Sequence, residues 1–333
     1  FMRGYYHLML ILNWEKIIIR DKYLTDQADL NKPLSDRITC WNFVIDELKL
    51  GTALPATRPS TEIGRATSGA AHAYLGFAYL TRAYEESAQE TQHLADALTA
   101  LNAVTGYELV SGDALIDMFN GRNKNCKESI FEVQYSSNTD NGARYYSWIH
   151  NFIASSELGG WDEILPNDFL VSEFKKEGKI SNHGRYDERI FYDRPSFRRF
   201  TPRELSEMDT RCNFNIPLMR YVNVLLMKAE VLNKQGHPEQ AIPIINDIRA
   251  KHGNMPAMKG TSQAEVQAQI EHERIIEFPL ESYRWYDLRR WGKLTEALGS
   301  RGFVEGKHNF FPIPLWEINA NPTLNSTVEE TTE

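Results

Sequence analysis

The 333-residue chain is poor in cysteine, and its three cysteines form no recognisable set. Cys40, Cys126 and Cys212 are far apart, and none belongs to a Cys-x-x-Cys pair, which excludes a disulfide framework and a zinc ribbon. The chain also lacks a long apolar run. Its most apolar stretch, residues 8–19, is interrupted by polar and charged side chains, whereas a membrane-spanning helix needs about 20 apolar residues. No transmembrane helix is expected.

Basic charge is scarce as well. The 37 lysines and arginines are outnumbered by 45 acidic residues, which gives a net charge of -8. No basic run interleaved with aromatic residues offsets this balance, so we expect no nucleic-acid partner. A composition of 42% hydrophobic and 25% charged residues is that of an ordinary globular protein with one or two domains.

Catalytic signatures are missing too. His272 and Glu273 begin the zinc-protease motif His-Glu-x-x-His, but Ile276 stands where the second histidine would be, so that motif fails. There is no Gly-x-Ser-x-Gly, Walker or dinucleotide motif and no calcium loop, and no pair of acidic residues is singled out as a glycosidase pair. We therefore expect a protein that is not an enzyme and that holds neither a metal nor a cofactor.

Helical periodicity is present at both ends of the chain. Residues 1–20 and 33–50 are predicted to be amphipathic helices. The second places four apolar side chains on one stripe: Ile38, Trp41, Ile45 and Leu48. A helix rich in alanine and glycine follows from about residue 64 to 86, and another runs from about 91 to 104. The small residues allow a neighbouring helix to approach closely.

Residues 225–248 fit the tetratricopeptide helix-turn-helix template. Ala229 and Ala241 supply the small residues where two helices cross, and Gly236 supplies the turn between them. We predict a mainly α fold, a tetratricopeptide-like helix-pair scaffold with a long, irregular, loop-rich insertion. The predicted divisions are 1–105 for the first helices, 106–217 for a loop-rich ligand-binding lobe, and 218–333 for the last helices and the tail.

The helices near the C-terminus have a distinctive charged and aromatic sequence. Residues 273–278 read Glu-Arg-x-x-Glu-Phe, and residues 284–291 read Arg-Trp-x-Asp-Leu-Arg-Arg-Trp. The spacing predicts two helices joined by a tight turn. Three kinds of ion pair are expected there: Glu271 with Arg274, Asp287 with Arg290, and a structural clamp from Arg274 or Glu277 to Arg284, Asp287 or Arg289. This sequence resembles the C-terminal signature of the SusD/RagB family of outer-membrane nutrient-binding lipoproteins.

Other segments are similar to landmarks of that family, in the family's order. They are the Gly-Arg-Ala-Thr-x-Gly-Ala-Ala stretch at 64–71, the segments at 159–174 and 216–233, and the Pro-Ile-Pro tail at 311–325. Ser68 and Gly69 replace the usual lysine and variable residue of the first landmark. The resemblance covers nearly all of the chain. We expect the lipid-attachment cysteine and the family's N-terminal region to lie upstream of it.

The resemblance implies a cell-surface lipoprotein of Bacteroidota, anchored in the outer membrane through that upstream cysteine. It implies capture of oligosaccharides or, as in the RagB branch, of peptides. It also implies a partner, a SusC-like TonB-dependent transporter for which such a protein acts as the lid. The expected mechanism is binding without chemistry.

Sugar recognition suggests which residues would bind. Aromatic rings cover apolar sugar faces, and planar polar side chains satisfy hydroxyl groups. Glycines beside Trp161 suit a loop that exposes a ring. The ligand-binding candidates all lie in the irregular segment: Asp140, Asn141, Arg144, Tyr145, Tyr146, Trp148 and Trp161.

One other reading stays open, an intracellular tetratricopeptide scaffold that holds a partner's peptide in its groove. The long aromatic insertion and the terminal Pro-Ile-Pro segment argue against it, because a pure repeat array needs neither. A signal peptide upstream would separate the two readings.

Overall fold

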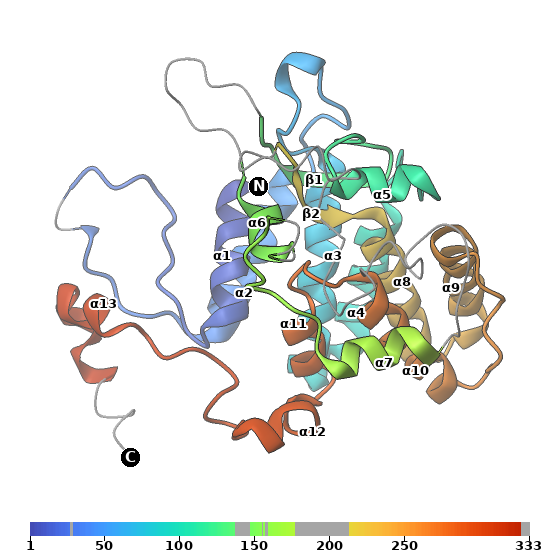
Figure 1. Cartoon of the computed structure of the whole chain (residues 1–333). Coiled ribbons are helices and arrows are strands. Elements are labelled where there is room, and N and C mark those ends of the chain that lie inside the picture. The colour runs from blue at the N-terminus through green and yellow to red at the C-terminus, as the bar shows by residue number, and fades with distance from the viewer. Residues whose placement is uncertain (27–28, 137–146, 155, 157–158, 177–212, 328–333) are drawn as a thin grey trace.

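The computed structural model describes residues 1–26, 29–136, 147–154, 156, 159–176 and 213–327, and helices dominate these ranges (Figure 1). The α-helices of the described residues are α1 (Met2–Asn13), α2 (Arg37–Gly51), α3 (Ser68–Glu85), α4 (Glu90–Asn102), α5 (Asp113–Phe119), α6 (Ile149–Ile153), α7 (Asp168–Lys176), α8 (Tyr221–Lys234), α9 (Pro238–Gly253), α10 (Gln263–Glu277), α11 (Arg284–Arg290), α12 (Leu294–Leu298) and α13 (Leu315–Ala320). Short 3-10 turns lie at Ser60–Glu62, Ser87–Gln89, Gly299–Arg301 and Pro322–Thr327.

The longer helices form one continuous stack. Helix α1 packs on α2, α2 on α3, and α3 on α4. Helix α4 packs directly on α8, and α8, α9 and α10 pack on one another. The helices before and after the irregular segment therefore belong to a single scaffold, as the tetratricopeptide-like pattern predicts. No helix among the described residues combines the length and apolar character that a bilayer span requires.

Small residues set the close contact between α3 and α4. Ala73, Ala78 and Ala97 are fully buried, and a Cβ atom on Gly76 would lie 2.5 Å from Cδ2 of Leu101. Two helices can approach this closely only where one of them lacks a side chain. The core continues from these helices into α1, α2 and α8 through buried residues such as Leu8, Trp41, Leu48, Phe77 and Val231.

The first two helices differ from the sequence prediction. The first helix ends at Asn13 instead of continuing to residue 20, and Trp14 is already extended (φ -122°, ψ 141°). The β-branched run at 17–19 therefore lies outside the helix, with Ile17 bridged to Ser35, in keeping with the preference of such residues for extended backbone. The second helix begins at Arg37, because the Asp36 carboxylate accepts a hydrogen bond from the Thr39 amide at 2.9 Å.

The predicted apolar stripe of that second helix is wrong at one position. Trp41, Ile45 and Leu48 are buried, but Ile38 is 57% exposed. The helix buries Val44 and not Ile38, because its buried face follows Cys40, Val44 and Leu48 at a spacing of four, and Ile38 lies at the edge of that face.

The irregular segment leaves the scaffold and returns to it at a two-stranded antiparallel sheet. Strand β1 (Ser129–Val133) pairs with β2 (Ile216–Arg220), so that Ser129 lies opposite Arg220 and Val133 opposite Ile216. Figure 1 shows this sheet beside the upper ends of α3 and α8. The chain before residue 134 and the chain after residue 215 are thus joined by this sheet. The division of the chain at 105 and 217 stays a prediction.

A buried charge network ties the sheet to the last helices. Arg220, at the end of β2, donates hydrogen bonds to Glu128 (2.7 Å), Glu277 (2.8 Å) and Glu281 (2.8 Å). The ring nitrogens of His252 lie 2.9 Å from Glu128 and 3.1 Å from Glu277. Three carboxylates and two cationic side chains, buried together, satisfy one another, which is the condition for charges to be tolerated in a core.

The clamp across the signature helices is confirmed, and one predicted pair is wrong. Arg274 Nε donates to Asp287 Oδ2 at 2.8 Å, and Arg290 lies 3.0 Å from Asp287. Glu271, however, pairs with Lys293 at 2.5 Å and not with Arg274. Arg274 instead points into the core toward Asp287. The carboxylate of Asp287, on the facing helix α11, compensates the burial of the guanidinium charge.

Candidate functional site

The short helix α6 is held against the protein by one side only. His150, Asn151 and Ile153 are buried, and Ile153 packs with Leu115 and Phe119 of α5. Residues four positions apart lie on the same face of a helix. Trp148, which caps the helix, and Phe152 therefore share the opposite face, which no described element covers.

Three exposed aromatic rings gather on that face. Trp148 is 38% exposed, Phe152 42% and Trp161 46%. The Trp148 and Trp161 rings are stacked, with centroids 5.8 Å apart and planes 23° apart, and Phe152 meets Trp161 edge to face at 5.0 Å. We call Trp148, Phe152 and Trp161 the aromatic platform. Single exposed rings are ordinary, but exposed rings that gather into one patch are typical of binding surfaces.

Backbone hydrogen bonds fix Trp161 beside the helix. Its amide donates to the Asn151 carbonyl at 2.7 Å, and the amides of Glu163 and Ile164 both donate to the Phe152 carbonyl, at 3.0 and 3.1 Å. The orphan carbonyls at the end of α6 are satisfied in this way. The platform is therefore set in place by its backbone before any ligand arrives.

Two glycines make this chain path possible. Gly159 has a φ of +85°, which strongly favours glycine, and a Cβ atom on Gly160 would lie 2.0 Å from the Ala154 carbonyl oxygen. Only a glycine allows the chain to turn back so closely onto α6. The expectation that glycines beside Trp161 expose its ring agrees with this geometry.

The structure places two of the seven sequence candidates together. Trp148 and Trp161 stack, as described above. The other five, Asp140, Asn141, Arg144, Tyr145 and Tyr146, lie outside the described residues. Sequence reasoning missed Phe152. Its spacing of four from Trp148 within residues 148–153 was the available signal, and it would have been usable had that stretch been recognised as a helix.

Among the described residues, one group has the spacing of metal ligands: Glu128, His252 and Glu277, whose nearest ligand atoms lie within 4.8 Å of one another. Arg220 donates to both carboxylates and so occupies the place of a cation. Burial alone would lower the pKa of His252, but the two carboxylates outweigh burial and raise the pKa to about 9. The group is an ion network, and we do not assign it as a metal centre.

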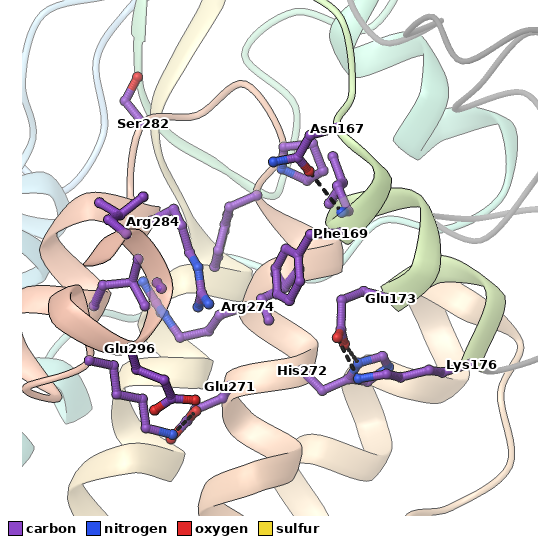
Figure 2. Close-up of a pocket in the computed structure, with 18 of the residues that line it drawn as sticks. Asn167, Phe169, Glu173, Lys176, Glu271, His272, Arg274, Ser282, Arg284 and Glu296 are labelled. Carbon is purple, nitrogen blue, oxygen red and sulfur yellow. Dashed lines mark hydrogen bonds and ion pairs between the residues drawn. The ribbon is translucent and has the colours of Figure 1, made fainter. Parts of the chain in front are cut away.

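A separate concavity lies beside α10 and α11, the two helices that contain the charged and aromatic sequence at 273–291. A pocket of about 900 Å³ is bounded by α7, α10, α11 and α12 (Figure 2). It shares no residue with the aromatic platform.

Comparison with known proteins agrees with this architecture. A model of the SusD family matches residues 198–308. SusD-like protein P38 of Formosa agariphila is 34% identical over 122 residues, 34% of this chain and 24% of that protein. The structure of a SusD superfamily protein from Bacteroides vulgatus superposes with a TM-score of 0.77 at 26% identity, covering 97% of this chain and 75% of that one.

The chain is a SusD-like protein. SusD-like protein P2 of Formosa agariphila, 25% identical, aligns with 80% of the SusD-like chain, which spans 60% of that relative. A structure described as a laminarin binding SusD-like protein has the same fold, with a TM-score of 0.77 at 21% identity over 96% of this chain and 75% of that one. The mainly helical, tetratricopeptide-like scaffold predicted from the sequence is thereby confirmed.

Proposed function

We propose that this SusD-like protein captures oligosaccharides on the aromatic platform, without catalysis, for import through a SusC-like TonB-dependent transporter at the cell surface. The observation that carries the proposal is the stacked, half-exposed Trp148 and Trp161 pair on a backbone-fixed loop. The likeness to a laminarin binding SusD-like protein supports a glycan as the ligand.

The platform suits a sugar for a physical reason. The axial C–H groups of a pyranose form an apolar face, and that face is buried well by a flat ring. Three rings held in fixed orientation lose little conformational entropy on binding, so more of the burial energy contributes to affinity. Neighbouring polar groups then supply hydroxyl recognition. Asn141 and Arg144 remain proposed for that part, as do Asp140, Tyr145 and Tyr146.

The test is calorimetry of the full-length natural protein with β-glucan, α-glucan and host-glycan oligosaccharides. Truncating Trp161 to Ala should cost about 2 kcal/mol, roughly a thirtyfold loss of affinity, and Trp148→Ala should cost a similar amount. Trp316→Ala is the matched control, because Trp316 is a tryptophan that is 70% exposed on α13, away from the platform. Its affinity should equal that of the parent.

Three outcomes would refute parts of the proposal. Equal affinity in the parent, Trp148→Ala and Trp161→Ala would remove the platform as the site. Binding of peptides with no glycan bound would assign the protein to the peptide-capturing branch. Cleavage of a bound glycan by purified protein, retained after repeated purification, would contradict capture without catalysis.

The transporter partner needs its own test. The natural protein should co-purify from outer membranes with a TonB-dependent transporter, and deleting that transporter should abolish glycan uptake while leaving surface binding of the glycan intact. Recovery of the protein from the cytoplasm, unlipidated, would favour the intracellular scaffold instead.

A further inference from the structure

The pocket between α7, α10, α11 and α12 has a lining that is partly apolar. Phe169 comes from α7, Ile275 from α10, Phe278 and Leu280 from the turn after α10, and Leu288 from α11. A volume of about 900 Å³ is in the range of sites that enclose a small molecule. These walls would cover the apolar body of a ligand.

The pocket lining contains more basic than acidic side chains. Five of them are lysine or arginine and three are glutamate, so the lining is net positive. Five of these eight already have a partner: Glu173 pairs with Lys176 and also contacts His272 (Figure 2), Glu271 pairs with Lys293, and Arg274 pairs with Asp287. A ligand would therefore meet the charges that these pairs leave over.

Two arginines have donors that the described residues leave unmet. Arg284 extends into the pocket toward Arg274 and Phe169 in Figure 2, with its guanidinium carbon 5.8 Å from the Phe169 ring centre. Its Nη1 is buried and finds no acceptor in the described parts of the chain. Arg274, which is 2% exposed, uses Nε on Asp287 and Nη1 on Asn223, and its Nη2 likewise has no acceptor within the described ranges.

A donor left without an acceptor is destabilising, because a buried polar group loses its hydrogen bonds to water and gains none from the protein. The two guanidinium groups also repel each other. Burial lowers the pKa of Arg284, the carboxylates of Asp287, Glu271 and Glu173 oppose that decrease, and the nearby Arg274 adds a smaller part to it. One anion placed between the two guanidinium groups would relieve both the missing hydrogen bonds and the repulsion.

The wall of the pocket also contains backbone in a sparsely populated region. Leu280 has a φ of 69° and Ser282 a φ of 63°, and both line the pocket in the turn between α10 and α11. Non-glycine residues held at positive φ recur at ligand sites, where the surrounding structure maintains them. This turn therefore has a feature typical of a binding site at the same place as the unmet donors.

We propose that this pocket is a second ligand site, and that it binds a small organic carboxylate with an apolar body. The carboxylate would accept hydrogen bonds from Arg284 and Arg274, and the body would lie against Phe169 and the neighbouring aliphatic side chains. The site is independent of glycan capture on the aromatic platform. Either one can fail while the other holds.

The experiment is calorimetry of the parent with phenylacetate and with phenylacetamide, which has the same shape without the charge. Phenylacetate should bind, and the amide should bind at least about tenfold more weakly, since a charge-assisted hydrogen bond is roughly twice as strong as a neutral one. This comparison needs no variant. Equal binding of acid and amide, or no binding of the acid at millimolar concentration, would overturn the proposal.

Variants then locate the site. Arg284→Gln should weaken phenylacetate binding about tenfold or more, whereas Lys251→Gln, which removes the same charge from an exposed position on α9, should leave it unchanged. Phe169→Ala should weaken the acid and the amide alike. Unchanged affinity in Arg284→Gln at an unchanged melting temperature would refute the assignment. Inorganic sulfate binding as tightly as phenylacetate would refute the apolar part of it.

Discussion

Asp287→Ala is the sharpest test of the buried clamp between the signature helices. Asp287 is 1% exposed, and its carboxylate accepts a hydrogen bond from Arg274 Nε at 2.8 Å and lies 3.0 Å from Arg290. Arg290 also makes two hydrogen bonds of 2.8 Å to Glu230. Two cations and two anions are thus buried together, and they balance.

The magnitude follows from that balance. Removing Asp287 leaves Arg274 and Arg290 with only Glu230 as an anion, so one positive charge is buried without compensation. Arg274 keeps its hydrogen bond to Asn223, and Arg290 keeps Glu230, so both side chains stay partly satisfied. Breaking one partner out of a buried ion pair costs about 3–5 kcal/mol, and we expect a loss of that size in the free energy of unfolding.

The assay is urea unfolding followed by circular dichroism, with Asp247→Ala as the matched control. Asp247 is also ion-paired, to Lys251 at 3.1 Å, but both side chains of that pair are about half exposed. Exposed pairs contribute about 0–1 kcal/mol, so the control should barely change stability. Asp287→Asn keeps the volume and removes the charge, and it should be destabilised in the same direction as Asp287→Ala.

The reasoning would be refuted if Asp287→Ala lost no more stability than Asp247→Ala. It would also be refuted if Asp287→Asn were as stable as the parent, because the charge would then be irrelevant. Glycan affinity should be unchanged in every folded variant, since Asp287 lies outside the aromatic platform. Loss of glycan binding at unchanged stability would instead make this pair part of a binding site.

Three further predictions concern pH and two glycines. The folded pKa of His252, about 9, lies above the ordinary value of about 6.5, so its stabilising contribution is complete below about pH 6.5 and is lost as pH rises through 9. Unfolding free energies measured across that window should fall by at most about 3 kcal/mol in the parent and stay flat in His252→Gln, and a flat parent profile would contradict this. Gly160→Ala should displace the platform loop and weaken glycan binding in calorimetry, whereas Gly299→Ala, which meets only a 3.7 Å contact, should not; equal affinities would count against the loop geometry. Gly76→Val should lower the melting temperature through its clash with Leu101, at a cost of about 1–3 kcal/mol, and an unchanged melting temperature would show that the two helices separate freely.

The exposure of Trp161 could be predicted from the sequence, because it depends on the glycines directly before it. Two glycines before Trp161 predict an exposed ring whatever the rest of the chain does, since they act on the backbone of that loop alone. Phe152 and the stacking of Trp161 on Trp148 were not visible in this way. They depend on the loop folding back onto α6 through hydrogen bonds to Asn151 and Phe152, and no periodicity records such a contact.

The ion pairs of α10 and α11 were likewise only partly predictable from the sequence. The sequence indicated that Asp287 would be a structural partner, because helical spacing puts charged residues between apolar ones. It could not assign the partner of Glu271. Spacing offered Arg274 three positions away, but the facing helices offered a buried carboxylate to Arg274 and left Lys293 for Glu271.

The sequence by itself determined the helical scaffold, the position of its small-residue crossings and the family resemblance, because each depends on residues close together in the chain. The tertiary structure alone decided where the first helix stops, that Ile38 is exposed, and that α4 packs directly on α8, which begins more than a hundred residues further along the chain. It alone brought Arg274 and Arg284 to one pocket, where each has a donor that no described residue accepts. Contacts between distant segments are chosen by burial and charge balance in three dimensions, and the local spacing of residues along the chain does not reveal them.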